Sequence, residues 1–173
     1  MNLTKKITNL VCVITMTMPC LAHWEFNEDG NLERWTPNGN VSKLEAKDGL
    51  LTVSVAANAG PPFIRRLVDV DGSQYPGVYA RMRWSADTTG SVGARFIFKP
   101  VGESTKAIPF VDQVPTPDQG FKTVIIPMEH PDIPAATKEA WNKPLQWIRF
   151  NLMNNVQVDY TVDFDWVRLA GEY

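Results

Sequence analysis

The stretch QWIRFNLM, residues 146–153, alternates apolar and polar side chains at every second position. Successive side chains of an extended chain point to opposite faces of a sheet, so this period of two is typical of a half-buried β-strand. The pattern therefore predicts a strand with Ile148, Phe150 and Leu152 in a core. Its opposite face would present Trp147, Arg149 and Asn151.

The same alternation recurs along the chain between short turn signals such as Asp48-Gly49 and Asp71-Gly72-Ser73. The predicted strands are Trp24–Asn27, Val41–Ala46, Leu50–Ala56, Phe63–Asp69, Val78–Trp84, Val92–Lys99, Ala107–Gln113, Phe121–Pro127, Gln146–Met153 and Tyr160–Leu169. One short helix is expected at Pro134–Asn142, where alanine, lysine and glutamate favour helical backbone. Many short strands and at most one short helix predict an all-β fold, a two-sheet β-sandwich or jelly roll.

The first 22 residues have the features of a cleaved secretory signal peptide. Lys5 and Lys6 precede an uncharged, mainly apolar segment over residues 7–18, and Cys20 and Ala22 fit the small-x-small cleavage pattern. A lipoprotein signal would acylate Cys20 instead, but the proline directly before it argues against that alternative. Cleavage after Ala22 leaves residues 23–173 as a single domain, secreted or periplasmic.

Cleavage would also change the composition of the chain. Both cysteines, Cys12 and Cys20, leave with the signal, so the mature chain would fold without a disulfide. The loss of two lysines takes the formal charge from −2 to −4, which gives no reason to expect nucleic acid or an anionic membrane as a partner. No second long apolar run follows, and we expect a monomer that does not insert into a membrane.

Arginine and aromatic residues share the polar faces of several predicted strands. If these strands are neighbours, one sheet face carries Tyr79, Arg81, Arg83, Arg95, Trp147, Arg149 and Asn151. Flat aromatic rings suit the C–H faces of sugars, and planar guanidinium and amide groups suit their hydroxyls and carboxylates. The alternative is that each arginine is simply solvated, and the sequence does not show which strands are adjacent.

The tryptophans divide into two groups. Trp35, Trp84 and Trp166 are expected in the core, because large aromatic residues at alternating strand positions usually pack there. Trp141 lies beside the predicted helix and Trp147 on a polar strand face, so these two are the candidates for ligand binding.

The two ends of the mature chain carry the most specific pattern. It opens with WEFNEDG at residues 24–30 followed by Trp35, continues with Asp48-Gly49, and closes with DFDWVRL at residues 163–169. This pattern resembles that of the galactose-binding-like, jelly-roll carbohydrate-binding modules. The resemblance implies a non-catalytic domain that binds polysaccharide or oligosaccharide.

The resemblance also implies a structural Ca²⁺ near the first and last strands. Its ligands would be Asp165 and, from the opening motif, Glu25 or Glu28, with Asp29, Asp48 and backbone carbonyls contributing. Calcium takes six to eight oxygen ligands, so this set is incomplete. The alternative is that these carboxylates belong to ordinary turns and strand ends.

Catalysis has little support in the sequence. The mature chain has no cysteine, no Gly-x-Ser-x-Gly motif and no glycine-rich phosphate loop. One enzyme hypothesis remains, because cleavage after Ala22 would make His23 the N-terminal residue. Lytic polysaccharide monooxygenases bind copper through an N-terminal histidine and a second histidine, which here is His130.

These observations favour a non-catalytic module that binds a polysaccharide, with an acidic glycan expected from the number of arginines. Two alternatives stay open: a copper-dependent oxidase built on His23 and His130, and a structural or adhesive surface domain with a protein partner.

Overall fold

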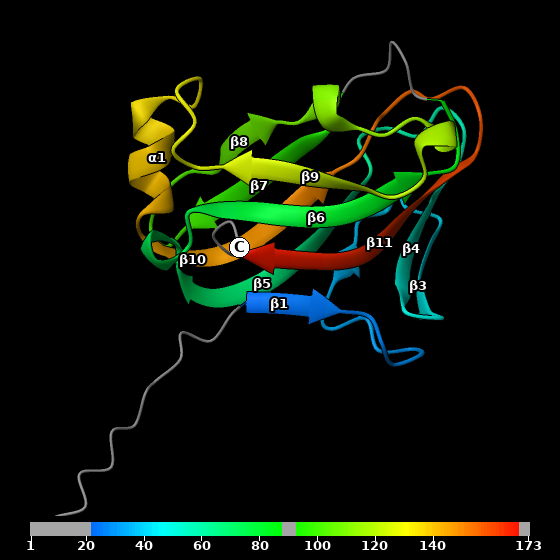
Figure 1. The fold of residues 1–173 in the computed structure, drawn as a ribbon, viewed down its shortest axis with the longest axis horizontal. Helices are drawn as coiled ribbons and strands as arrows, with labels where there is room; N and C mark the ends of the chain where they lie inside the picture. Colours follow the sequence, from blue (N-terminus) through cyan, green and yellow to red (C-terminus); the bar gives the residue numbers. More distant parts are fainter. Residues whose placement is uncertain (1–21, 88–92, 170–173) are drawn as a thin grey trace, which may run out of the picture.

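The computed structural model describes residues 22–87 and 93–169, which form eleven β-strands and one α-helix (Figure 1). The helix is α1 (Ala135–Trp141), and three single 3₁₀ turns, η1 (Gly72–Gln74), η2 (Val111–Gln113) and η3 (Pro117–Gln119), lie in the connections. The strands are β1 (Ala22–Glu25), β2 (Thr36–Pro37), β3 (Lys43–Lys47), β4 (Leu50–Val55), β5 (Phe63–Asp71), β6 (Gly77–Trp84), β7 (Arg95–Pro100), β8 (Lys106–Pro109), β9 (Lys122–Pro127), β10 (Pro144–Asn151) and β11 (Tyr160–Leu169).

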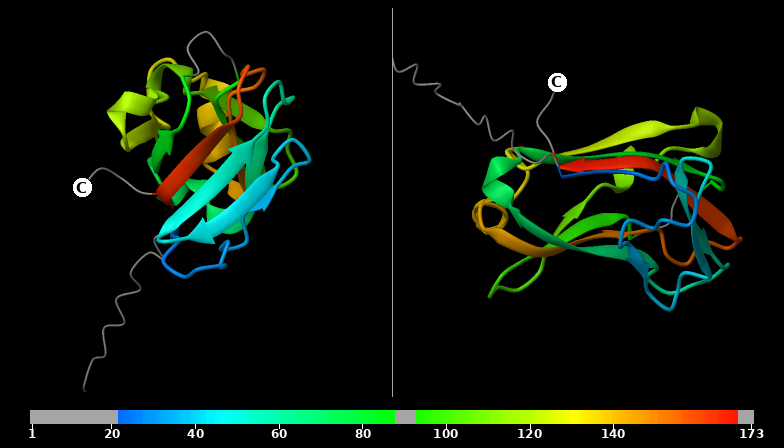
Figure 2. Two further views of the ribbon diagram at one scale, coloured as in Figure 1. Left: turned by 90° about the vertical axis from the view of Figure 1, so that its right-hand side faces the viewer. Right: turned by 90° about the horizontal axis from the view of Figure 1, so that it is seen from below.

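The strands form two antiparallel sheets that pack face to face, seen as separate layers in Figure 2. The six-stranded sheet has the order β3-β4-β11-β6-β9, with β1 also paired to β11. The five-stranded sheet has the order β2-β5-β10-β7-β8. The predicted all-β sandwich with one short helix is therefore confirmed. Each predicted strand overlaps an observed one, and the two-residue strand β2 was not predicted.

Strand β11 joins the two ends of the domain. Its first half pairs with β4 and its second half pairs with β1, so β1 continues the line of β4 along the same side of β11. On its other side β11 pairs with β6, and the register shifts between Phe164 and Trp166. This bulge puts one extra residue on β11, so Phe164 and Val167 are both fully buried although they are three positions apart.

The bulge also decides the position of one tryptophan. Trp166 turns to the outer face and is only partly buried, with the Arg168 guanidinium 4.3 Å from its ring centroid. The prediction that Trp166 lies in the core is therefore wrong, because a strict period of two does not survive the extra residue. Trp35 and Trp84 are buried, as predicted.

Aromatic rings from both sheets make the centre of the core. Phe150 of β10 contacts Phe96 and Phe164, with ring centroids 5.4 and 5.5 Å apart, and Trp35 at 6.0 Å. Ile148, Phe150 and Leu152 are each fully buried, which confirms the inward face predicted for residues 146–153. Their alternate neighbours, Trp147, Arg149 and Asn151, point away from the core and remain partly exposed.

Tyr160 gives the core a titratable group. Its ring stacks on Trp84 with centroids 5.6 Å apart, and its hydroxyl donates a hydrogen bond to the Met153 carbonyl. Burial raises the pKa of Tyr160 well above its usual value of 10.0. The unfolded chain therefore releases this proton at a lower pH than the folded chain does, so the stabilisation is complete below about pH 10 and is lost as the pH rises further.

We expect Tyr160→Phe to lower the free energy of unfolding by about 1 kcal/mol at neutral pH, because the hydrogen bond is lost while the stacking is kept. Above pH 10 the wild-type protein should lose up to about 1.4 kcal/mol per pH unit from this group, and the variant should lack that component. Urea unfolding between about pH 8 and pH 11 measures both slopes. Equal slopes for the two proteins would contradict the prediction.

The predicted signal peptide lies outside the described residues except for Ala22, which is the first residue of β1 and pairs with Leu169. Val92, the first residue of the predicted strand Val92–Lys99, lies outside them as well. Within residues 22–87 and 93–169, no helix has the length and apolar character needed to cross a membrane.

Candidate functional site

The outer face of the five-stranded sheet carries a three-by-three array of side chains. Three neighbouring strands contribute, with β10 between β5 and β7. Cross-strand pairing sets three rows: Leu67–Trp147–Lys99, Arg65–Arg149–Ile97 and Phe63–Asn151–Arg95. We call these nine residues the β10 face. Side chains directly opposite one another on a sheet have Cβ atoms about 5 Å apart, so the rows form one continuous surface.

Arg149 occupies the middle of the β10 face. Its guanidinium lies 4.4 Å from the ring centroid of Phe63 and 5.5 Å from that of Trp147. Its Nε is shielded from solvent and has no hydrogen-bond partner among the described residues. Desolvation is the main cause that lowers the pKa of Arg149, and the positive charge of the neighbouring Arg65 lowers it further. The guanidinium therefore lies within cation–π distance of two aromatic rings and pairs with no carboxylate of the described residues.

Two cations lie near the Trp147 ring. The guanidiniums of Arg65 and Arg149, which are paired in the next row of the sheet, lie 5.9 Å and 5.5 Å from its ring centroid. Next to it on β5, the Leu67 side chain is 65% exposed. The combination provides an apolar patch bordered by hydrogen-bond donors. Such a surface suits a ligand with both C–H faces and polar substituents.

The β10 face contains four cations and no carboxylate: Arg65, Arg95, Lys99 and Arg149. None of the four forms an ion pair with any carboxylate in the described part of the chain. The next acidic residue on this side of β5 is Asp69, two positions beyond Leu67. The electrostatic potential over the β10 face is therefore positive.

The outer face of the six-stranded sheet has the opposite character. Arg81 pairs with Asp165 at 2.6 Å and Arg83 with Asp163 at 2.8 Å, and both guanidiniums lie over the Phe121 ring. The Asp163 carboxylate also accepts a hydrogen bond from the Thr52 hydroxyl at 2.7 Å. Here both arginines are neutralised by a carboxylate on the adjacent strand β11.

These positions correct the predicted single binding surface. Tyr79, Arg81 and Arg83 belong to β6 in the six-stranded sheet, and the other four belong to the five-stranded sheet. The two groups face away from each other on opposite sides of the sandwich. The structure brings together only Arg95, Trp147, Arg149 and Asn151, all on the β10 face.

Trp141 was predicted as a ligand-binding residue, and this is wrong. It is the last residue of α1 and is 1% exposed, with its Nε1 donating a 2.7 Å hydrogen bond to the Tyr75 carbonyl. Its ring contacts Phe98 and Phe96, with centroids 5.1 and 6.1 Å away. The helix lies across one end of the sandwich (Figure 1), and the buried Trp141 side chain closes the core there.

The predicted calcium ligands do not converge. Glu25 contacts Arg168 at 3.3 Å and accepts from Asn27, Glu28 accepts from Asn31, and Asp165 turns toward Arg81. Within the described residues, no three acidic or histidine side chains are grouped closely enough to hold a metal ion. The residues present therefore do not fit the expected ion, and we propose none here.

The copper hypothesis is not supported by the topology. His23 lies in β1, which is separated from β9 by β11 and β6. Three strand spacings of about 4.8 Å put roughly 14 Å between β1 and β9, and His130 follows the end of β9. The Nε2 atom of His23 accepts a 2.8 Å hydrogen bond from Arg168. Burial is the main cause that lowers the pKa of His23, and the charge of Arg168 lowers it further. One copper ion therefore cannot take both imidazoles as ligands in this arrangement.

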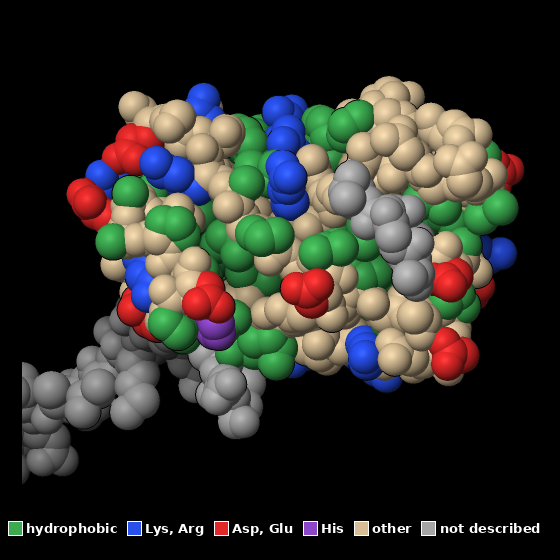
Figure 3. All heavy atoms as spheres, turned by 90° about the horizontal axis from the view of Figure 1, so that it is seen from above, with side chains coloured by type: hydrophobic (Ala, Val, Ile, Leu, Met, Phe, Trp, Pro, Cys, Tyr) green, Lys and Arg blue, Asp and Glu red, His purple; other side chains and the backbone are tan. Residues whose placement is uncertain are grey.

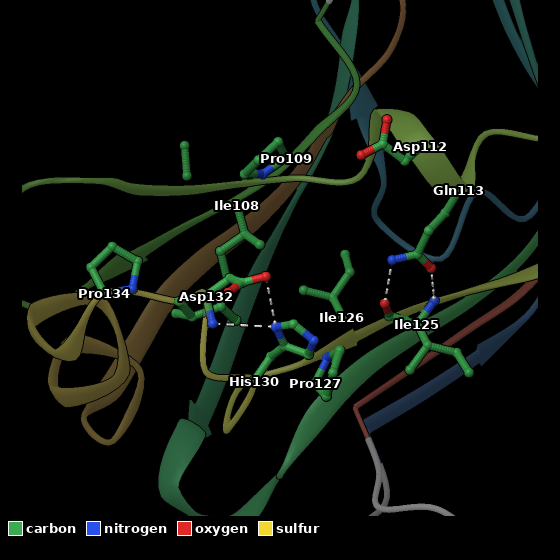
Figure 4. A pocket seen from close by; sticks show the side chains of 12 residues that line it. Ile108, Pro109, Asp112, Gln113, Ile125, Ile126, Pro127, His130, Asp132 and Pro134 are labelled. Carbon is green, nitrogen blue, oxygen red and sulfur yellow. Dashed lines mark hydrogen bonds and ion pairs between the residues drawn. The ribbon is translucent and has the colours of Figure 1, made fainter.

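His130 instead lines a pocket of about 290 Å³ at the open edge between β8 and β9 (Figure 4). Figure 3 looks onto this edge and shows hydrophobic side chains gathered across its centre. Three of the pocket's polar residues, Gln113, His130 and Asp132, already interact within the protein. The Gln113 amide makes two 2.8 Å hydrogen bonds with the Ile125 backbone, and the Asp132 amide donates to His130 at 3.3 Å. The β10 face is therefore the better candidate for ligand binding.

Comparison with known proteins places this fold. No protein-family model and no curated protein matches the chain. A family 11 carbohydrate-binding module from Clostridium thermocellum, solved with a β-1,3-1,4-mixed-linked tetrasaccharide, has a TM-score of 0.52 and 16% identity over 86% of this chain and 96% of its own. The chain has the β-sandwich fold of carbohydrate-binding modules.

Two further solved structures agree on the fold. A variant of a family 29 carbohydrate-binding module, complexed with cellulohexaose, has a TM-score of 0.51 and 10% identity, over 86% of this chain and 90% of its own. PfGH50B has a TM-score of 0.57 and 12% identity over 80% of this chain. That match covers only 22% of PfGH50B, so a similar sandwich also occurs as part of a longer protein.

Sequence reasoning missed five residues of the β10 face: Phe63, Arg65, Leu67, Ile97 and Lys99. The alternation of β5 and β7 placed them on outer faces. The missing information was the pairing of both strands with β10, which joins segments far apart in the sequence.

Proposed function

We propose that this protein binds polysaccharide chains without chemically changing them, through the β10 face. The observation that supports this most directly is the partly exposed Trp147 ring beside the Arg65 and Arg149 guanidiniums, which pair with no carboxylate of the described residues. A sugar ring would stack on Trp147 and Leu67. The guanidinium groups and the Asn151 amide would bind its polar substituents.

The similar structures support the same class of ligand. The family 11 module was solved with a mixed-linked tetrasaccharide and the family 29 variant with cellulohexaose. The low identities mean that the glycan itself has to be established on this protein. Export through the predicted signal peptide would place the protein where polysaccharides are encountered. The role as a structural or adhesive domain with a protein partner stays a hypothesis.

We expect Trp147→Ala to weaken polysaccharide binding about 10- to 100-fold. Removing an aromatic ring from the centre of a binding surface costs roughly 1.5–3 kcal/mol of binding free energy. The measurement is affinity electrophoresis of residues 23–173 through gels that contain a panel of neutral and acidic polysaccharides. Selective retardation in one gel identifies the ligand, and Trp147→Ala should reduce that retardation strongly.

The matched control is Trp166→Ala. Trp166 is also partly buried and lies beside a stacked arginine, but it belongs to the opposite face of the sandwich. This variant should be retarded as strongly as the wild type. Equal loss in both variants would move the site away from the β10 face. Retardation in none of the gels would reject polysaccharide binding and favour the protein-partner hypothesis.

A further inference from the structure

The two outer faces of the sandwich treat their cations differently. On the six-stranded sheet, Arg81, Arg83 and Arg168 each contact a carboxylate on a neighbouring strand. On the β10 face, no described carboxylate contacts any of the four cations. The same chain therefore neutralises arginine on one surface and leaves it unpaired on the other.

The unpaired arrangement is unfavourable in the absence of a ligand. Arg65 and Arg149 are directly opposite each other on adjacent strands, and like charges in that position destabilise a sheet. Arg149 is partly desolvated as well, which further disfavours its charge. An anion bound between the two guanidiniums would relieve both effects.

The cations also extend along the sheet. Arg95 and Lys99 lie four residues apart on β7, a distance of about 13 Å at roughly 3.3 Å per residue. On β10, Asn151 lies opposite Arg95 and Trp147 lies opposite Lys99. Arg149 lies between these two rows, opposite Ile97. An extended polymer with repeated negative groups matches this pattern better than a single small anion does.

We infer that the ligand of the β10 face is an anionic polysaccharide, whose carboxylate or sulfate groups bind Arg65, Arg149 and Arg95. This inference rests on the proposed function and names the class of glycan. Guanidinium binds both oxyanions with paired hydrogen bonds, and Trp147 stacks on the sugar ring between them. The whole chain is acidic, with a formal charge of −2, so a general attraction to polyanions is not expected.

The test compares matched pairs of polymers that differ in charge. Residues 23–173 are run through gels containing polygalacturonate or its fully methyl-esterified form, and dextran sulfate or dextran. We expect the anionic member of at least one pair to bind about 10-fold or more tightly, with the affinity falling between about 0.05 and 0.5 M NaCl. The first pair reports on carboxylate and the second on sulfate.

Two variants locate the effect. Arg149→Gln and the exposed Arg65→Gln should each weaken binding of the anionic polymer about 10-fold and reduce its salt dependence. Arg168→Gln makes the same change in charge on the opposite sheet and should leave binding unchanged. Because Arg65 is exposed, its variant remains informative even if Arg149→Gln folds poorly.

Other outcomes overturn the inference in distinguishable ways. Equal or tighter, salt-independent binding of neutral polymers would reject an anionic ligand and leave the proposed function intact. Binding of poly-L-glutamate as tight as that of the acidic polysaccharides would reject a sugar requirement. Binding of none of these glycans, nor of mixed-linked β-glucan or cellulohexaose, would reject the inference together with the proposed function.

Discussion

Gly72→Ala is expected to lower the free energy of unfolding by about 3 kcal/mol or more. Gly72 opens the turn between β5 and β6, where its amide donates to the Lys143 carbonyl at 3.1 Å and its carbonyl accepts from Tyr75 at 2.9 Å. A Cβ atom added there would lie 2.0 Å from the Trp141 carbonyl oxygen. Real carbon–oxygen contacts are far longer, so the turn or the end of α1 would have to move.

The obstacle at Gly72 is backbone, which adapts less easily than the end of a flexible side chain. Urea unfolding followed by tryptophan fluorescence measures the loss of stability. Gly39→Ala is the control, because a Cβ atom at Gly39 has no neighbour within 4 Å and the residue is exposed. The control should change stability by less than about 0.5 kcal/mol. A similarly small effect at Gly72 would mean that α1 does not pack on the turn as described.

Local alternation predicted most of the fold. The sets Val78, Ala80, Met82 and Trp84 on β6, and Phe96 and Phe98 on β7, all point inward as the period of two requires. Departures arose where local pattern and tertiary packing disagree. The β11 bulge reversed the orientation expected for Trp166, and packing of α1 on the end of the sandwich buried Trp141.

The candidate site was less predictable, because it depends on which strands are adjacent. Alternation assigns Arg81 and Arg149 to outer faces but does not say that these faces lie on opposite sheets. It also does not show that Asp163 and Asp165 are next to β6 and neutralise its arginines. The difference between paired and unpaired arginines, on which the anionic ligand rests, therefore became visible only with the strand order.

Trp141→Ala is expected to destabilise the protein by about 3–5 kcal/mol, the usual range when a large buried aromatic side chain is truncated. The change removes the contacts with Phe96 and Phe98 and leaves the Tyr75 carbonyl without its 2.7 Å hydrogen bond. Trp141→Phe should recover part of the loss, because the ring volume is largely kept while the hydrogen bond is not.

Trp147→Ala provides the contrast that separates the two tryptophans predicted as ligand-binding. Its ring is partly exposed on the β10 face, so truncation should change the free energy of unfolding by no more than about 1 kcal/mol while it weakens polysaccharide binding. Chemical unfolding and affinity electrophoresis on the same three proteins give both quantities. If Trp141→Ala unfolds like the wild type and loses binding, the position of α1 is wrong and Trp141 belongs to the binding surface. If instead only Trp147→Ala loses binding and only Trp141→Ala loses stability, ligand binding and closure of the core are carried by different tryptophans, only six positions apart along the chain.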